Sequence, residues 1–270
     1  MAVTREKLAS CDPVWARLRT EAESMAEREP ALAGFIHATL LNHDRLEHAL
    51  SYHMARKLGG EDLSPLAVRE TFEEAIAADP EIGAALRADL SAVLDRDPAC
   101  HSFAEAFLNY KGFHALQCYR IAHWLWARGR APMALFFQSR ISQIFAVDIH
   151  PAAKIGRGIL IDHGTGVVIG ETAVVEDDVS IMQDVTLGGT GKERGDRHPK
   201  VRRGVLISLG AKVLGNIEIG EYSRVGAGSV VLISVPPGCT AVGVPAKLIN
   251  CKGSERPSHE MDHFIDDDSG

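Results

Sequence analysis

The sequence predicts a two-part α+β protein, with an all-helical domain over residues 1–145 followed by a parallel β-helix over residues 146–250. Three observations favour this organisation. Of the 16 aromatic residues, 13 lie before residue 141 and only three after it. Helix-capping side chains followed by proline recur in the first part, and aliphatic residues recur every six positions in the second.

The first part has repeated signals for helix starts. Asp12-Pro13, Ser64-Pro65 and Asp79-Pro80 each place a capping side chain before a proline at the first helical position. Apolar residues then recur at helical spacing. Two such groups are Leu46, Ala49, Leu50 and Met54, and Phe113, Leu116, Ile121 and Leu125. These patterns predict a packed helical domain.

The second part has a six-residue period that neither a helix nor an ordinary strand produces. Small or turn-permissive residues separate the aliphatic positions, so each hexad can form a short strand and a tight turn, and three hexads can form one triangular coil. The aliphatic side chains are expected to point inward. They are Ile149, Ile155, Ile161, Ile169, Val175, Ile181, Leu187, Val201, Ile207, Val213, Ile219, Val225 and Val231.

Two interruptions of this period are candidates for the chemistry. The phase breaks after Asp162-His163, and residues 188–200 are too many for a turn, so they are expected to leave the coil as a loop. Within or just after this loop lie Lys192, Arg194, Arg197, Lys200, Arg202 and Arg203, against Glu193 and Asp196. This basic segment is either a solvated charged loop or a site for a phosphorylated cofactor and a carboxylate. His163 and His198 are either ordinary surface residues or residues with a role in the chemistry.

Composition excludes several classes of protein. The net charge of −7 argues against general nucleic-acid binding. No apolar run approaches the roughly 20 residues that span a bilayer, and the charged start, residues 1–7, does not resemble a signal peptide, so we expect a cytoplasmic protein without a membrane partner. The cysteines are odd in number and scattered, which favours reduced thiols over a disulfide framework or a zinc site. They are Cys11, Cys100, Cys118, Cys239 and Cys251.

Several segments resemble the serine O-acetyltransferases, a family of hexapeptide-repeat acyltransferases. They are Ile36-His-Ala-Thr-Leu-Leu, Lys111-Gly-Phe-His-Ala-Leu-Gln, Asp148 to Gly166, Val185-Thr-Leu-Gly-Gly-Thr-Gly-Lys and Gly195-Asp-Arg-His-Pro-Lys. The resemblance covers roughly residues 12–250. It implies a left-handed β-helix as the catalytic domain and a helical oligomerisation domain. The polar residues 251–270 that follow are expected to form a flexible tail. The implied activity is transfer of an acetyl group from acetyl-CoA to the hydroxyl of L-serine, on the route to cysteine.

The resemblance assigns the catalytic pair to His163 and Asp148. A serine hydroxyl is a weak nucleophile near neutral pH, and an imidazole can take its proton and later return it to the leaving thiolate. His163 is the expected general base, and Asp148 is expected to orient it and stabilise the imidazolium. No suitably placed Cys or Ser nucleophile accompanies the histidine, so direct attack in a ternary complex is favoured over an acyl-enzyme.

The resemblance also assigns an acceptor site. Arg197 and His198 match the loop residues that meet the serine carboxylate, and Asp97 and Asp162 match the residues that bind its ammonium group. Asp97 has a second explanation, because Asp97-Pro98 is also a pattern for a helix N-cap.

For the donor, the resemblance places the pantetheine arm of acetyl-CoA between neighbouring β-helices, near Gly189, Leu209 and Ala227, with Lys247 available to the phosphates. Relatives commonly read Gly-Ala-Gly-Ala-Lys where this chain has Ser208-Leu-Gly-Ala-Lys. The larger Leu209 side chain therefore changes the expected groove, although a backbone contact can survive. No metal is expected.

The resemblance further implies a hexamer built from two trimers and feedback inhibition by L-cysteine at the serine site. Many relatives dock a C-terminal isoleucine into O-acetylserine sulfhydrylase. This chain ends in Asp266-Asp-Asp-Ser-Gly270, with its last isoleucine at position 265, which argues against that complex.

Other patterns point elsewhere. His259-Glu-Met-Asp-His263 matches the H-E-x-x-H zinc-protease pattern but lies in a polar tail, and Gly188 to Lys192 lacks the first glycine and the Ser/Thr of a P-loop. Two alternatives remain open at this stage. One is a zinc enzyme that uses His150, His163 and His198, and the other is a non-catalytic scaffold for a partner enzyme.

Overall fold

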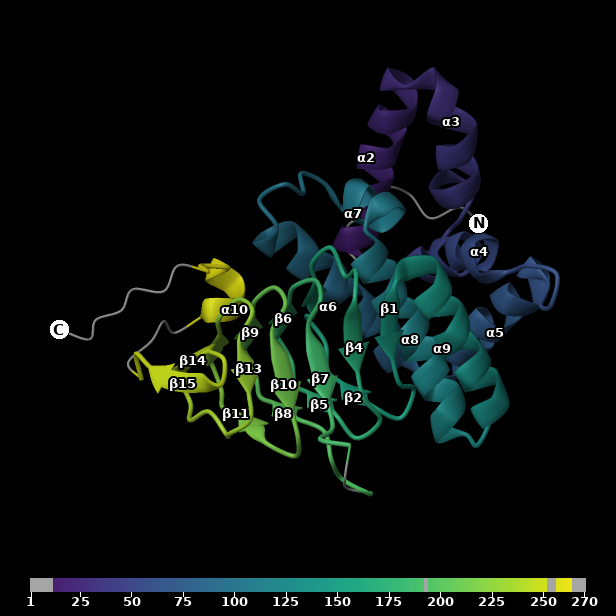
Figure 1. Cartoon of the computed structure of the whole chain (residues 1–270). Helices are drawn as coiled ribbons and strands as arrows, with labels where there is room; N and C mark the ends of the chain where they lie inside the picture. Colours follow the sequence, from purple (N-terminus) through teal and green to yellow (C-terminus); the bar gives the residue numbers. More distant parts are fainter. Residues whose placement is uncertain (1–11, 192–193, 252–255, 264–270) are drawn as a thin grey trace.

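The computed structural model describes residues 12–191, 194–251 and 256–263, and it has the predicted two-part architecture (Figure 1). A helical domain precedes a β-helix whose coils run from α9 toward the C-terminal helix α10. The helices are α2 (Pro13–Arg28), α3 (Pro30–Ile36), the π-helix η1 (His37–Leu41), α4 (Leu46–Leu58), α5 (Pro65–Ala78), α6 (Pro80–Arg96), α7 (Phe103–Asn109), α8 (Lys111–Ala127), α9 (Ala131–Phe145) and α10 (Pro257–Glu260).

The three predicted helix starts are confirmed. The side chains of Asp12, Ser64 and Asp79 accept hydrogen bonds from the first-turn amides of α2, α5 and α6, and each helix has proline at its start. These bonds satisfy amides that have no partner within the helix. The two predicted apolar groups lie in α4 and α8 and are buried.

The second part is a parallel β-helix with three sheets. Face A has the strand order β1-β4-β7-β10-β13, face B has β11-β8-β5-β2, and face C has β15-β14-β12-β9-β6-β3. The strands are β1 (Val147–Ile149), β2 (Lys154–Ile155), β3 (Leu160–Ile161), β4 (Val167–Ile169), β5 (Val174–Val175), β6 (Ser180–Ile181), β7 (Thr186–Gly188), β8 (Lys200–Val201), β9 (Leu206–Ile207), β10 (Lys212–Leu214), β11 (Glu218–Ile219), β12 (Arg224–Val225), β13 (Val230–Val231), β14 (Thr240–Gly243) and β15 (Ala246–Ile249).

The register of the strands confirms the six-residue repeat. Along face A, Ile149, Ile169, Leu187, Val213 and Val231 are successive partners, so each aliphatic side chain stacks on the one in the coil above. The thirteen repeat positions all lie in strands, and twelve are buried, Ile155 being half-buried. A narrow apolar interior explains why aromatic residues are scarce in this part.

The predicted loop between residues 188 and 200 is also confirmed, because β7 ends at Gly188 and β8 begins at Lys200. Lys192 and Glu193, which belong to the predicted basic segment, lie outside the described residues.

Part of the predicted flexible tail packs against the fold. Pro257 and Ser258 are buried, and the Ser258 carbonyl accepts a hydrogen bond from the Ser180 hydroxyl at 2.8 Å. His259 lies 3.3 Å from Arg96, the last residue of α6. Residues 257–259 of the predicted tail thus have defined contacts with the β-helix and with α6. Residues 264–270, with the last isoleucine, lie outside the described residues.

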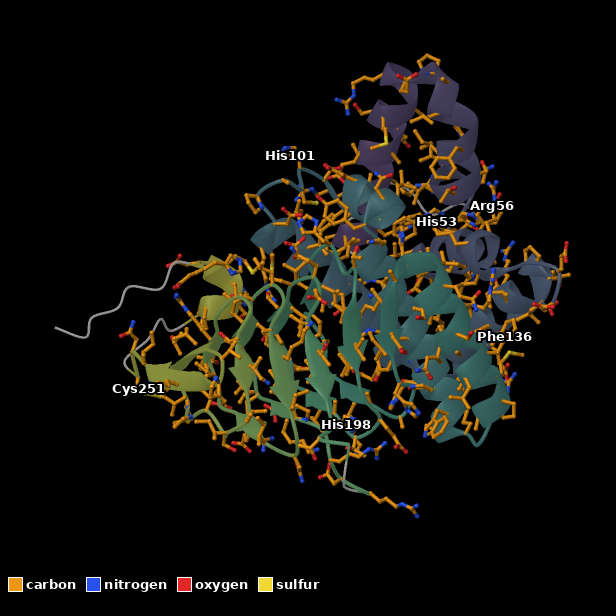
Figure 2. The ribbon with its side chains drawn as sticks, in the orientation of Figure 1. His53, Arg56, His101, Phe136, His198 and Cys251 are labelled. Atoms are coloured by element: carbon orange, nitrogen blue, oxygen red, sulfur yellow. A yellow bond between two sulfur atoms is a disulfide. The ribbon has the colours of Figure 1, made fainter. Side chains whose placement is uncertain are left out.

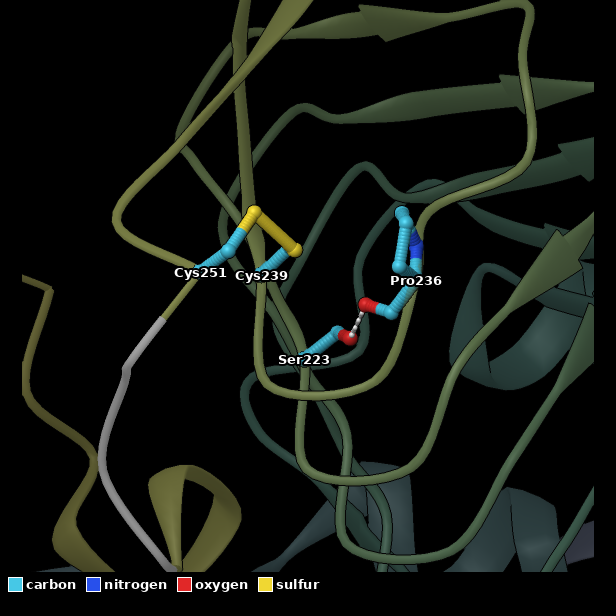
Figure 3. The surroundings of a disulfide bond; sticks show 4 residues. All are labelled: Ser223, Pro236, Cys239 and Cys251. Carbon is cyan, nitrogen blue, oxygen red and sulfur yellow. Dashed lines mark hydrogen bonds between the residues drawn. A yellow bond between two sulfur atoms is a disulfide. The ribbon is translucent and has the colours of Figure 1, made fainter.

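The expectation of reduced cysteines is wrong for two of the five. Cys239 and Cys251 are joined by a disulfide (Figure 3). The antiparallel pairing of β14 with β15 places Thr240 opposite Ile249, which returns the chain to Cys239. Cys100 and Cys118 are buried free thiols, and Cys11 lies outside the described residues.

No helix among the described residues is long and apolar enough to cross a membrane.

Candidate active site

The predicted site residues lie along the two edges of face A. Its strands are parallel, so the corners that lead into them share one edge, here called the leading edge, and the corners that follow them share the other, the trailing edge. A three-residue strand separates the two edges by about 10 Å.

His163 occupies a leading-edge corner between β3 and β4, as predicted. Its φ of +54° is in the left-handed region, which is uncommon for a residue with a side chain. The side chain is 69% exposed, and its Nε2 atom lies 3.9 Å from Oδ1 of Asp162. The imidazole is therefore available to a substrate at this corner.

Asp97 and Asp162 lie together beside His163. Burial raises the pKa of Asp162, the His163 charge opposes that shift, and the negative charge of Asp97 adds to it. The two carboxylates thus interact although they are 65 residues apart in the sequence. A pair of carboxylates suits an ammonium group, because a cation relieves their repulsion.

The alternative explanation of Asp97 as a helix N-cap is wrong. Asp97 follows the last residue of α6, and its backbone amide donates to the Val93 carbonyl, so it is the C-cap of that helix. Its Oδ1 accepts a 2.8 Å hydrogen bond from the Ala99 amide, whereas the next helix starts at Ser102. The proline at position 98 ends α6 and starts no helix.

Asp148 lies on β1, opposite Val168 of β4, with its Oδ1 accepting a 2.7 Å hydrogen bond from Gln138 of α9. Among the described residues, no ion pair joins Asp148 to His163, and the carboxylate nearest to the imidazole is Asp162. The predicted His163–Asp148 pair therefore stays a prediction.

Arg197 and His198 lie at the trailing edge and are fixed by Thr172. The backbone amides of both residues donate to the Thr172 hydroxyl, at 3.0 and 3.1 Å. The Thr172 amide donates to Nδ1 of His198 at 3.2 Å. Arg197 also pairs with Glu171 at 2.7 Å, which holds the pKa of that carboxyl below its usual range. This part of the loop is thus closely attached to the β-helix.

Within a single chain, the two halves of the predicted acceptor site lie at opposite edges of face A. His163, Asp162 and Asp97 lie at the leading edge, whereas Arg197 and His198 lie at the trailing edge. In Figure 2, His198 lies at the lower side of the β-helix, and His101, in the loop after Asp97, lies above its upper side.

The predicted donor residues also divide between the edges. Leu209 and Ala227 are exposed at successive leading-edge corners, and the Gly228 amide donates to the Leu209 carbonyl at 2.8 Å. Gly189 follows β7 at the trailing edge, where a Cβ would lie 3.4 Å from the Arg197 carbonyl oxygen. Lys247 is exposed on β15.

The predicted basic segment is largely neutralised by neighbouring coils. Arg202 pairs with Glu176 and Glu218, and Arg203 with Asp177. These charges lie at the end of face B and the corners that follow its strands, so they do not form a patch at either edge of face A. Arg197 remains the candidate for a carboxylate.

His263 was not among the predicted site residues. Its Nδ1 lies 3.0 Å from the Ser208 hydroxyl, and its charge acts on Asp162, so the C-terminal segment reaches the leading edge. His259 has a different partner, Arg96, which agrees with the rejection of the zinc-protease pattern. The only sequence signal was that pattern. His150 lies with Arg197 at the trailing edge, away from His163.

Comparisons with known proteins decide the family. The family described as "Serine acetyltransferase, N-terminal" matches residues 14–118. A serine acetyltransferase from Salmonella typhimurium is 58% identical over 252 residues, which are 93% of this chain and 92% of that protein. The chain belongs to the serine acetyltransferase family.

Solved serine acetyltransferases share the whole fold. The structure from Vibrio cholerae superposes with a TM-score of 0.92 at 56% identity, covering 94% of this chain and 98% of that one. A complex with cysteine gives a TM-score of 0.91 at 51% identity, with 94% and 98% covered. A Brucella abortus complex with coenzyme A gives 0.88 at 53% identity, with 90% and 97% covered. The fold class is thereby confirmed.

Proposed function

We propose that this protein transfers the acetyl group of acetyl-CoA to the hydroxyl of L-serine, giving O-acetyl-L-serine and CoA for cysteine biosynthesis. The observation that carries this proposal is the group of Asp97, Asp162 and His163 at one corner, in a chain of this family. Two carboxylates suit the ammonium group of an amino acid, and the exposed imidazole beside them suits its hydroxyl.

The proposed reaction is direct attack within a ternary complex. Nε2 of His163 takes the hydroxyl proton of serine as its oxygen attacks the thioester carbonyl carbon. The tetrahedral intermediate collapses and breaks the carbon–sulfur bond, and the imidazolium returns the proton to the thiolate of CoA. Asp148 is proposed to stabilise the imidazolium after the exposed His163 side chain turns toward it.

The active site is proposed to form between two copies of the chain. Asp97, Asp162 and His163 of one copy would bind the ammonium and hydroxyl groups, and Arg197 and His198 of the next copy would bind the carboxylate. The separation of these groups between the two edges of face A supports the proposal, because a cyclic trimer brings the leading edge of one copy to the trailing edge of the next.

The pantetheine arm of acetyl-CoA is proposed to lie in the same junction. Leu209 and Ala227 are exposed on the leading edge, and the half-buried Gly189 lies on the trailing edge, which supports a groove shared by two copies. Lys247 is the proposed contact of the phosphates. L-cysteine is proposed as an inhibitor at the serine site, because it differs from serine only in having a sulfur atom in place of the hydroxyl oxygen. Two trimers joined by the helical domains would give the hexamer.

Release of CoA thiol from acetyl-CoA tests the activity. The purified protein is expected to release thiol with L-serine, and much less with homoserine, a galactoside or no acceptor. Release that does not depend on serine contradicts the proposal.

Two variants test the base and the shared site. His163→Ala is expected to lower kcat by at least about 10²-fold, the usual contribution of a general base. His101→Ala, in an exposed loop, is the matched control. Arg197→Ala is expected to raise the KM for serine.

The two single variants, His163→Ala and Arg197→Ala, are each expected to be nearly inactive when assayed separately at subsaturating serine. When the two are co-expressed and assemble together, junctions between unlike copies can contain one intact set of residues. Activity should therefore recover in the mixed assemblies. A mixture no more active than the separate variants would contradict a site shared between copies.

A further inference from the structure

The start of α8 lies in backbone contact with the corner that carries His163. A Cβ on Gly112 would lie 2.0 Å from the carbonyl oxygen of Ile161, and a Cβ on Gly164 would lie 3.2 Å from the Cα of Gly112. Any side chain at position 112 would push the corner away. The motif that begins Lys111-Gly112 is thus in contact with the proposed site, although the proposed reaction does not use it.

Lys111 holds the other end of the same corner. Its Nζ atom donates a hydrogen bond to the hydroxyl of Thr165. In the sequence, His163 lies halfway between Ile161, which contacts Gly112, and Thr165. Because His163 has a left-handed backbone conformation, its corner depends on such surrounding contacts to keep its shape.

Tyr110, the N-cap residue of α8, contacts the acceptor site from a third direction. Its side chain lies beside Cys100 and Asp97, and burial, as the largest cause, raises the pKa of Tyr110, with both neighbours adding to the shift, so the hydroxyl stays protonated at neutral pH. The Ala99 amide donates to Oδ1 of the same carboxylate. The Ala99 amide therefore holds one side of the Asp97 carboxylate, and the protonated Tyr110 hydroxyl beside it is available as a second donor.

We infer that Tyr110 and Lys111 are positioning residues of the acceptor site, Tyr110 for the Asp97 carboxylate and Lys111 for the corner with Asp162 and His163. The inference rests on the proposed function. Three consecutive residues of one helix start meet both elements that supply the site, Asp97 after α6 and the corner between β3 and β4. The helical domain thereby aligns two carboxylates that come from different parts of the chain.

Tyr110→Phe tests the first role, because it keeps the ring and removes only the hydroxyl. The KM for serine is expected to rise roughly tenfold, as for a lost hydrogen bond to a charged group. The KM for acetyl-CoA and the thermal midpoint should stay near those of the wild type. Tyr52→Phe is the matched control, since within the described part of the chain the Tyr52 hydroxyl accepts a hydrogen bond from the exposed Arg56 alone, at 3.5 Å. An unchanged KM for serine in Tyr110→Phe overturns this role.

Lys111→Met tests the second role, because it removes the ammonium group and keeps an unbranched side chain. We expect kcat to fall roughly tenfold, since the corner that carries the base is released, and Lys111→Arg to recover most of the loss. Thr165→Val should have the same effect, and the double variant should lose no more than either single variant. Additive losses overturn the role.

The wild-type protein is assayed in parallel, because its activity distinguishes a failure of the proposed function from a failure of the positioning roles. Absence of serine-dependent thiol release by the wild type contradicts the proposed function itself. A wild type that is active, with variants that match it in KM for serine and in kcat, contradicts only the positioning roles.

Discussion

The imidazole of His198 lies over the α-carbon of Gly170, with Nε2 only 2.0 Å from the position that a Cβ on residue 170 would occupy. Nδ1 of the same ring accepts a hydrogen bond from the Thr172 amide. The ring is therefore held on one side by a bond and lies on the other against a residue without a side chain.

Gly170→Ala is expected to displace this ring without unfolding the β-helix. The clash is with the tip of a side chain, so His198 can move, but it then leaves the position proposed for the serine carboxylate. We expect the KM for serine to rise about tenfold with little change in the KM for acetyl-CoA. Gly34→Ala is the control, because no other described residue outside its own stretch of helix lies within 4 Å of its Cβ position. Equal KM values for serine in both variants would contradict this argument.

The KM for serine is expected to rise as the pH falls. Burial and the charge of Asp97 raise the pKa of Asp162, whereas His163 and His263 oppose the shift. Asp162 therefore takes up a proton at a higher pH than an ordinary aspartate, and the neutral acid binds ammonium poorly. Asp97→Asn removes one negative neighbour, which should move the rise in KM to lower pH. A pH profile of KM that is unchanged in Asp97→Asn would refute the coupling of the two carboxylates.

The helical domain is expected to lose stability in mild acid. Burial, the largest cause, lowers the pKa of His53 to about 4 and that of His114 to about 3, and their rings lie 5.1 Å apart near Lys57 (Figure 2 labels His53). Both folded pKa values lie below the unfolded value near 6.5, so the unfolded state binds more protons as the pH falls. From pH 7 to pH 5 each histidine should lower the free energy of unfolding by about 2 kcal/mol.

Urea unfolding at pH 7 and pH 5 measures this effect. His114→Gln should have a smaller loss between the two pH values than the wild type, whatever its stability at pH 7. His101→Gln, at an exposed position, should keep the full loss. A wild-type stability that does not change between pH 7 and pH 5 would contradict the prediction.

Local periodicity explains how much of the fold could be predicted. The repeat from Ile149 to Val231 is visible because each coil uses the same short pattern, and breaks in that pattern located the corner at His163 and the loop after Gly188. Each coil also packs against the coil that precedes it and the coil that follows it in the sequence. A repeated local rule therefore predicts the core, the corners and the loop together.

The contacts that complete the site join distant parts of the chain, and no local pattern marks them. Arg96 meets His259 across 163 residues, and Lys111 meets Thr165 across 54. For the same reason the disulfide between Cys239 and Cys251 was missed, because it depends on the β14–β15 hairpin.

Asp89→Leu is expected to be the most destabilising of these changes, because Asp89 joins the two domains from a fully buried position. Its Oδ2 accepts bonds from Gln117 and from Nε and Nη2 of Arg120, and its Oδ1 accepts one from the Ile159 amide at 3.0 Å. Removing one partner of a buried ion pair leaves the other charge uncompensated, which costs about 3–5 kcal/mol. Glu74→Gln, in the exposed pair with Arg130, should cost at most about 1 kcal/mol. Urea unfolding of both variants measures the difference, and similar losses would show that the Asp89 pair contributes no more than a surface pair.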